Sequence, residues 1–243
     1  MATKCQHCPL RSREIFRKVN SSQLSSIQRF KSGELQIDRG TQILLEGSNS
    51  PQLFTVLKGQ ALRYKTLENG KRQVLNFVMP GDFIGLQAAL MGEMQHSVEA
   101  VTPMILCVFD RTEFFKFFAA NTNIAYEVAW IAAVEEHFLG DALTSLGQRS
   151  AVERMAWALL RIFRRSRQLG LERSSNVVPL PYKQQDLADA LGLSLVHTNK
   201  TLAKLRDKQL ASWSDGELHV FDEEAMSELA MLDPDVPVER PMI

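Results

Sequence analysis

The residues best suited to recognition chemistry lie in one short stretch of the C-terminal third. Between Ser194 and Lys204, polar side chains that carry hydrogen-bond donors are interspersed with leucines at helical spacing. Asn pairs with adenine and Lys with guanine or phosphate, and both can do so from the N-terminal end of a helix in the DNA major groove. The candidate DNA-contacting residues are Ser194, Val196, His197, Thr198, Asn199, Lys200 and Lys204.

Two short helical patterns within residues 182–205 frame this stretch. Gly192 allows a sharp turn between them, and Ser194 is suited to cap the second helix. Downstream, Ser214-Asp215-Gly216 is a hairpin signal between two short apolar stretches. The order of these features predicts a helix-turn-helix followed by a wing.

The charge distribution supports a phosphate-binding surface. The chain carries no net charge, yet residues 147–215 contain 12 Lys and Arg against 6 Asp and Glu, and they include the cluster Arg164, Arg165 and Arg167. Residues 216–243 hold one Arg against 8 acidic residues. A basic segment in a neutral protein is typical of a nucleic-acid footprint, although a solvated helical face gives the same count.

The remaining reactive side chains do not form a catalytic pattern. The glycines do not form a phosphate-binding loop. The five histidines show neither metal-ligand nor nucleophile spacing: His7, His96, His137, His197 and His219. We therefore expect no enzyme. The odd number of cysteines, two of them in Cys5-x-x-Cys8, argues against a disulfide framework and for reduced thiols or a metal site.

The N-terminal half predicts short antiparallel strands. Residues 33–108 are apolar stretches broken by glycines, and Glu68-Asn69-Gly70 supplies a tight hairpin turn. A closed or sandwiched β-structure would hide so many strand edges.

A long helix is predicted after this region, over residues 123–139 and beyond. Its apolar stripe either pairs with a second subunit or rests on its own β-domain, and Glu135 interrupts it. The candidate dimer-interface residues are Ile124, Val128, Ile131, Phe138 and Ala142.

Length and composition favour two globular domains, because 243 residues with 45% hydrophobic residues exceed one typical core. We expect an arm (1–20), a β-roll sensor domain (21–120), a dimerisation helix with hinge (121–148), a winged helix-turn-helix domain (149–232) and a disordered tail (233–243). Neither a signal peptide nor a membrane-spanning run is evident, which favours the cytoplasm.

With these features in order, the chain resembles the CRP/FNR superfamily of bacterial transcription regulators along nearly its whole length. The segments VLKGQALRYK, MPGDFIGLQAAL and QQDLADALGLSLVHTNKTLAKLRDKQL carry the resemblance. It implies an α+β fold: an N-terminal β-roll (a cyclic-nucleotide-binding-like jelly roll), a dimerisation helix and a C-terminal winged helix-turn-helix. It also implies a homodimer on two-fold symmetric double-stranded DNA that contacts RNA polymerase.

The effector pocket that the resemblance implies comprises Gly81, Phe83, Gly85, Leu86, His96 and Ser97. His96-Ser97 stands where cyclic-AMP-binding members have Arg-Ser. Without that arginine a buried phosphate would lack its bidentate partner, so we do not expect cyclic AMP as the effector. Val196-His-Thr-Asn199-Lys200 likewise departs from the common Glu-x-x-Ser-Arg, which predicts different base preferences.

The cysteines resemble part of the FNR iron–sulfur pattern, in which four thiolates hold the cluster. Cys5, Cys8 and Cys107 match, but Glu14 replaces the remaining cysteine, and a carboxylate is a weaker cluster ligand. Three alternatives stay open: a cluster, a thiol redox or zinc site completed by His7, or no metal, with Cys107 a small buried side chain.

The alternative function is a ligand-binding β-roll module that acts through protein–protein contacts without binding DNA. Lys200 and the arginine cluster are the features that distinguish the two, because DNA binding needs cations that neutralise phosphates.

Overall fold

The computed structural model describes residues 2–232 and 239–242. The chain divides into two compact units, of which the first comprises Met1–Gly70, Leu75–Glu135 and Glu239–Ile243 and the second Lys71–Val74 and Glu136–Val238. The division falls inside helix α4 (Thr122–Gln148), whereas we expected it at the helix's end. The expected break in the chain after α4 is nonetheless present. The Ser150 side chain caps the next helix by accepting a hydrogen bond from the backbone N–H of Glu153, so a new helix begins there.

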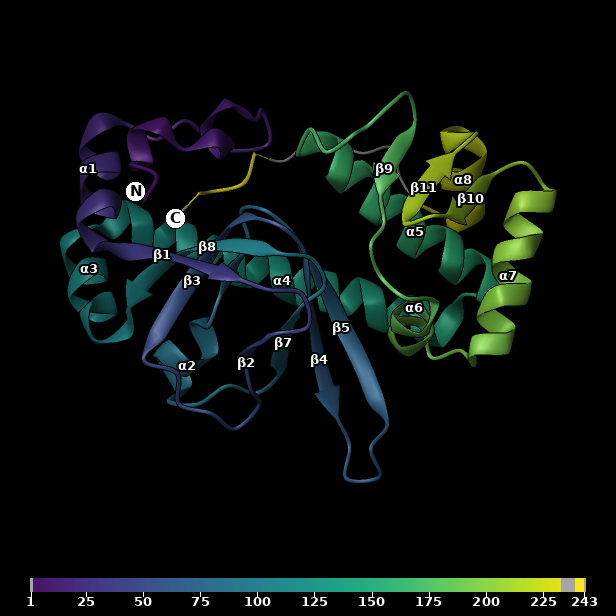
Figure 1. Cartoon of the computed structure of the whole chain (residues 1–243), viewed down its shortest axis with the longest axis horizontal. Coiled ribbons are helices and arrows are strands. Elements are labelled where there is room, and N and C mark those ends of the chain that lie inside the picture. Colours follow the sequence, from purple (N-terminus) through teal and green to yellow (C-terminus); the bar gives the residue numbers. More distant parts are fainter. Residues whose placement is uncertain (1, 233–238, 243) are drawn as a thin grey trace. The chain divides into compact units, whose positions relative to one another are not determined.

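Two four-stranded antiparallel sheets, as the glycine-punctuated sequence predicted, form the β-structure of the first unit, except that residues 72–74 at the start of one strand are assigned to the second unit (Figure 1). One sheet has the order β1-β8-β3-β6, and its strands are β1 (Lys31–Ile37), β8 (Met104–Asp110), β3 (Gln52–Lys58) and β6 (Phe83–Ile84). The other has the order β2-β7-β4-β5, and its strands are β2 (Gln42–Leu44), β7 (Ser97–Ala100), β4 (Ala61–Thr66) and β5 (Arg72–Val78). The turn between β4 and β5 uses Gly70 at φ +78°, as expected for this hairpin.

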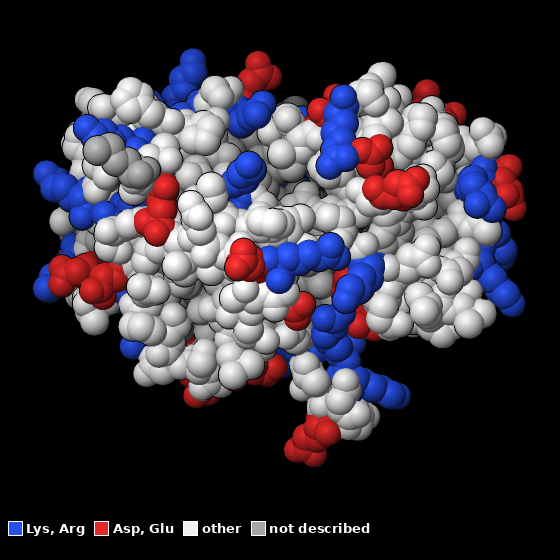
Figure 2. Space-filling model, viewed as in Figure 1, with Lys and Arg blue, Asp and Glu red and all other residues white. Residues whose placement is uncertain are grey.

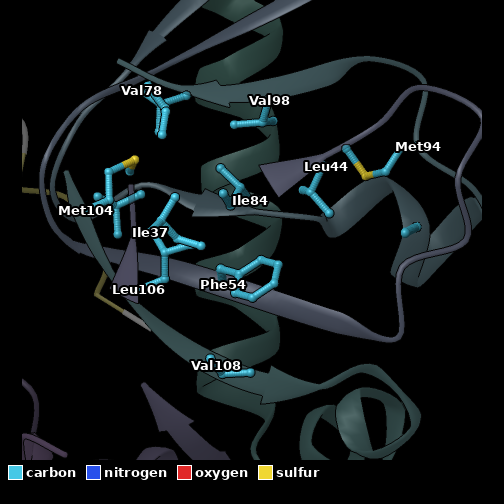
Figure 3. Packing of buried hydrophobic residues seen from close by; sticks show 14 residues of the cluster. Ile37, Leu44, Phe54, Val78, Ile84, Met94, Val98, Met104, Leu106 and Val108 are labelled. Carbon is cyan, nitrogen blue, oxygen red and sulfur yellow. The ribbon is translucent and has the colours of Figure 1, made fainter. Parts of the chain in front are cut away.

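Both sheets contribute side chains to one shared core. Phe54 and Leu106 from the first sheet meet Leu44 and Val98 from the second, with Met94 between strands, in a single buried cluster (Figure 3). This shared core makes the two sheets a β-roll.

Helices cover a second apolar cluster of the same unit. They are α1 (Ser21–Phe30), α2 (Leu86–Met91), α3 (Phe114–Ala120) and the first half of α4, and a short 3-10 turn, Arg111–Glu113, precedes α3. Phe30 stacks on Phe109 of β8 and on Phe117 of α3, with ring centroids 4.8 and 4.2 Å apart. Ile124, Val128 and Ile131 of α4 belong to this cluster.

The expected assignment of the α4 stripe to a subunit interface is therefore wrong for Ile124, Val128 and Ile131. Ile124, Val128 and Ile131 are at most 6% exposed because they pack within their own unit. Phe138 stacks on Trp157 of α5 at 6.2 Å, and Ala142 is half-buried. A heptad stripe indicates that one face of a helix is buried. Here residues of the same unit bury the first part of that face.

The second unit is built around α5 (Ala151–Gln168), whose Leu159, Leu160 and Phe163 are fully buried. Helices α6 (Gln184–Leu191), α7 (Leu195–Asp207) and α8 (Glu223–Ala230) pack against α5. A three-stranded antiparallel sheet completes the unit, in the order β10 (Ala211–Ser214), β11 (Glu217–Val220) and β9 (Val177–Pro179).

Both chain ends contribute to the first unit. The arm forms two 3-10 turns, Cys5–His7 and Pro9–Ser12. The prediction of a disordered tail is wrong for residues 239–242. The Arg240 side chain forms an ion pair with Asp82 at 3.2 Å, and its backbone forms an isolated parallel β-bridge with Phe16. Met242 is buried. Residues 233–238, the rest of the predicted tail, lie outside the described residues.

Candidate nucleic-acid interface

The turn between α6 and α7 has the geometry that the sequence predicted. Gly192 ends α6 at φ +62°, and the Ser194 hydroxyl caps α7 by accepting a hydrogen bond from the His197 N–H at 3.2 Å. Arg154 of α5 donates to the Leu191 carbonyl at 2.7 Å. The start of α7 is thus fixed by both a cap and a tether to the unit's central helix.

Helix α7 has one buried face and one exposed face. Thr198, Thr201 and Leu205 are buried against the unit. The other face exposes the remaining candidate residues: Val196, His197, Asn199, Lys200 and Lys204. An exposed helix face with polar and basic side chains at its N-terminal end is what a recognition helix requires.

Thr198 is the exception among the predicted contacts. Its side chain is 0% exposed, so it cannot face a DNA groove from this position. The expectation failed because Thr198 lies three residues before Thr201 and seven before Leu205, which places all three side chains on the same, buried face of the helix. Its neighbours point outward.

The positive charge on this part of the molecule comes mainly from α7 itself. Lys200, Lys204, Arg206 and Lys208 are exposed, and Lys and Arg side chains follow the α7 edge of the second unit (Figure 2). The arginine cluster at the C-terminal end of α5, by contrast, includes structural ion pairs. Arg164 and Arg167 both bind Glu223 of α8, at 2.8 and 2.7 Å.

The wing is a tight hairpin. Asp215 and Gly216 connect β10 to β11 with φ values of +53° and +74°, as a primed turn requires. The Ser214-Asp215-Gly216 signal in the sequence therefore predicted this hairpin and its position.

The residues expected to form an effector pocket in the β-roll serve largely structural roles. A Cβ on Gly81 would lie 2.2 Å from the Phe16 ring, and Gly85 caps α2 at φ +98°. Phe83 is buried near Phe109 and Phe114, and Leu86 packs against the same cluster.

His96 and Ser97 have polar surroundings, but they do not form a phosphate site. Burial, followed by the positive charge of Arg63, lowers the pKa of His96 to about 4, so this imidazole is neutral at pH 7. The buried Ser97 hydroxyl accepts a hydrogen bond from the Glu46 N–H at 3.0 Å. Neither residue replaces the missing arginine.

A polar network next to His96 was not predicted from the sequence. Arg63 of β4 forms a 2.8 Å ion pair with Glu135 of α4 and donates to the Phe83 carbonyl at 3.2 Å, and Asn76 also donates to Glu135. The only sequence signal was an acid in an otherwise apolar stripe. This acid ties α4 to the sheet of its own unit.

The three cysteines lie together, although Glu14 does not join them. Cys5, Cys8 and Cys107 line one cavity of the first unit, whereas Glu14 is exposed and absent from its lining. Within residues 2–232 and 239–242, no group of three or more His, Cys, Asp or Glu is arranged to hold a metal ion. The residue set does not fit an iron–sulfur cluster, which needs four ligands.

Both halves of the chain match known protein families. Residues 34–121 match the cyclic nucleotide-binding domain and residues 153–229 the Crp-like helix-turn-helix domain. The chain is 28% identical to the nitrogen fixation regulation protein FixK of Bradyrhizobium diazoefficiens, over 93% of each protein. It is 26% identical to the transcriptional activator protein FnrL of Cereibacter sphaeroides, over 90% of this chain and 87% of FnrL.

A solved structure shares the fold. The structure of FixK2 from Bradyrhizobium japonicum matches 84% of this chain and 98% of FixK2, with a TM-score of 0.73 and 22% identity. A β-roll, a long helix and a helix-turn-helix with an exposed basic face define a DNA-binding transcriptional regulator. The chain belongs to the CRP/FNR family of these regulators.

Proposed function

We propose that this regulator reads duplex DNA by placing the N-terminal half of α7 in the major groove. The observation that carries the proposal is the division of α7 into a face buried by Thr198, Thr201 and Leu205 and an exposed face with Asn199 and Lys200. The Ser194 cap and the Arg154 tether hold this helix start rigidly.

The exposed face determines the base preference. Asn199 can pair bidentately with adenine, Lys200 can donate to guanine or to a phosphate, and the exposed Val196 methyl groups suit the methyl group of thymine. Lys204, farther along the helix, fits a backbone phosphate. Ser194 caps α7, and the backbone at this helix start lies close to the DNA.

We further propose a homodimer that pairs through the exposed side of α4. Tyr126, Leu139 and Leu143 are 66%, 49% and 73% exposed, and Ala129 and Ala133 are exposed with them. Small residues at this spacing allow close approach of a second helix, and the larger ones provide apolar area. This face replaces the stripe that we first assigned to the interface.

We also propose where the regulator acts and which protein it contacts. Dimers on DNA would contact RNA polymerase in the cytoplasm, and the chain would act without catalysing a reaction. Within the described residues, none of the helices is long and apolar enough to cross a membrane. A cyclic nucleotide is not the proposed signal, because neutral His96 and the Arg63–Glu135 pair leave its phosphate without a cationic partner.

The test begins with selection of binding sites from a randomised duplex library, followed by fluorescence anisotropy with a selected duplex across a salt series. Lys200→Ala should weaken binding and lower the slope of log K against log salt by about 1 if Lys200 contacts a phosphate. Asn199→Ala should cost about 1–3 kcal/mol and relax specificity at one base position.

Lys116→Ala is the matched control, because it removes an exposed lysine from α3 of the other unit. It should bind like the wild type. Equal affinity of the wild type, Lys200→Ala and Asn199→Ala at every salt concentration would contradict the assignment of α7 as the recognition helix. Failure to select any duplex would favour a module that acts on proteins.

A further inference from the structure

The cavity in the first unit combines thiols with a buried cation in largely apolar surroundings. Cys5 and Cys8 line it from the N-terminal arm and Cys107 from β8, and its other walls include Leu10, Ile27 and Met242. The helix-turn-helix and its proposed DNA contacts do not account for this grouping of three thiols.

The arm that carries two of the thiols is held in a defined conformation. The Cys5 N–H donates to the Gln28 side chain of α1 at 2.6 Å, and the Thr3 N–H donates to Glu34 at 2.9 Å. The Lys31 ammonium, on a side chain only 4% exposed, donates to the Thr3 carbonyl and to Glu34, both at 2.7 Å. Cys5 also packs against the helix-covered apolar cluster.

The backbone brings Cys5 and Cys8 within disulfide distance. They are the two ends of a 3-10 turn, closed by a hydrogen bond from the Cys8 N–H to the Cys5 carbonyl at 3.2 Å. The Cα atoms at the ends of such a turn lie less than about 7 Å apart. A disulfide requires about 4.4–6.8 Å, so this turn can close without unfolding the arm.

Cys107 has a different environment. Burial raises the pKa of the Cys107 thiol to about 11, although the positive charge of Lys31 opposes this shift. Its strand β8 is paired with β1 on one side, at Glu34, and with β3 on the other, at Thr55, so its backbone is held in the middle of a sheet and is not free to follow the arm. Cys107 contributes a fixed, half-buried side chain to the cavity.

We propose that Cys5 and Cys8 form a reversible dithiol–disulfide pair, housed by this cavity, and that Cys107 stays outside the exchange. The co-reactant is a low-molecular-weight disulfide. Cys8, having lost its proton, attacks one sulfur of that disulfide, whose S–S bond breaks and whose other half leaves as a thiolate that takes up a proton. Cys5 then loses its proton and attacks the Cys8 sulfur, which releases the second small thiol.

The exchange is balanced. Two electrons pass from the protein dithiol to the small disulfide, and two protons go to the two thiols released. Cys8 reacts first because Cys5 packs against the helix-covered apolar cluster, which limits the approach of a small disulfide to its sulfur. The product disulfide is uncharged, so the apolar walls take it up without the cost of a buried thiolate.

The experiment uses the full chain in glutathione buffers with an increasing share of oxidised glutathione, followed by alkylation of free thiols and mass spectrometry. Wild type should lose two alkylatable thiols in one two-electron transition and regain them on reduction. The Cys5–Cys8 bond should appear within a single peptide. Cys107→Ser, the matched control, should show the same transition with the same midpoint.

Cys5→Ser and Cys8→Ser should each lose the transition. Cys5→Ser should instead trap glutathione as a mixed disulfide on Cys8. Three outcomes would overturn the proposal: a bond from Cys107 to either partner, a bond between two chains, or three alkylatable thiols at the most oxidising ratio. None of these readouts depends on DNA binding, so the proposed function is tested separately.

Discussion

At the scale of single residues, Thr198 lies within the predicted DNA-contacting stretch, but its side chain is buried. Its hydroxyl is buried and, within the described residues, has no hydrogen-bond partner. An unpaired buried hydroxyl costs stability, so Thr198→Val should raise the free energy of unfolding by about 1 kcal/mol in urea denaturation. Affinity for a selected duplex should stay unchanged, and a large loss of DNA affinity would return Thr198 to the groove-facing set.

His96 makes stability depend on pH. Its pKa of about 4 in the folded chain lies below the ordinary 6.5, because burial and then the charge of Arg63 disfavour its protonated form; Lys65 opposes protonation and Glu46 favours it. The unfolded chain therefore binds the proton first as the pH falls. Stability is full above about pH 6.5 and declines toward pH 4, at most about 1.4 kcal/mol per pH unit from this group.

The measurement compares wild type with His96→Gln in urea denaturation between pH 7.5 and pH 4.5 (roughly the window in which this histidine titrates). The variant should lose less stability across this range than the wild type. Parallel curves for the two proteins would mean that His96 titrates normally in the folded chain.

At the scale of elements, an ion pair holds α4 against its own β-roll. The side chains of Arg63 and Glu135 are 12% and 23% exposed, and Arg63 Nε is buried without a partner among the described residues. Removing one member of such a pair leaves the other uncompensated, so Glu135→Gln should destabilise the protein by about 2–3 kcal/mol. Glu136→Gln, an exposed neighbour, should change it by less than about 0.5 kcal/mol. Equal effects of the two variants would contradict the pairing.

The elements themselves were largely predictable, because their signals are local. The Asn69-Gly70 and Asp215-Gly216 turns and the Gly192-x-Ser194 junction each depend on a residue type that tolerates positive φ or caps a helix. The partners of these elements were not predictable in the same way. Neither the covering of Ile124 by its own β-roll nor the anchoring of Arg240 by Asp82 leaves a periodic signal in nearby sequence.

At the scale of the whole molecule, the sequence predicted a two-domain regulator, but three residues that it offered for the interface with a second subunit, Ile124, Val128 and Ile131, are buried within the chain. A helix that packs on its own domain can still present an opposite face to a partner. The face that we propose for the partner is the one with Tyr126, Leu139 and Leu143, which are exposed, whereas Ile124, Val128 and Ile131 of the more regular apolar stripe are buried. Regular apolar spacing identified a packed helix without identifying what it packs against.

The dimer itself gives the last prediction. Leu143→Glu places a carboxylate on the proposed α4 interface in both subunits, and burying each charge costs several kcal/mol. Dimer dissociation should therefore become at least about a hundredfold easier in analytical ultracentrifugation. Leu67→Glu, at another exposed leucine, in the β4–β5 turn, should leave dimer dissociation unchanged. Because two recognition helices must engage half-sites about 34 Å apart, Leu143→Glu should also lose affinity for a two-fold symmetric duplex. A Leu143→Glu protein that remains dimeric at all concentrations would remove α4 from the interface.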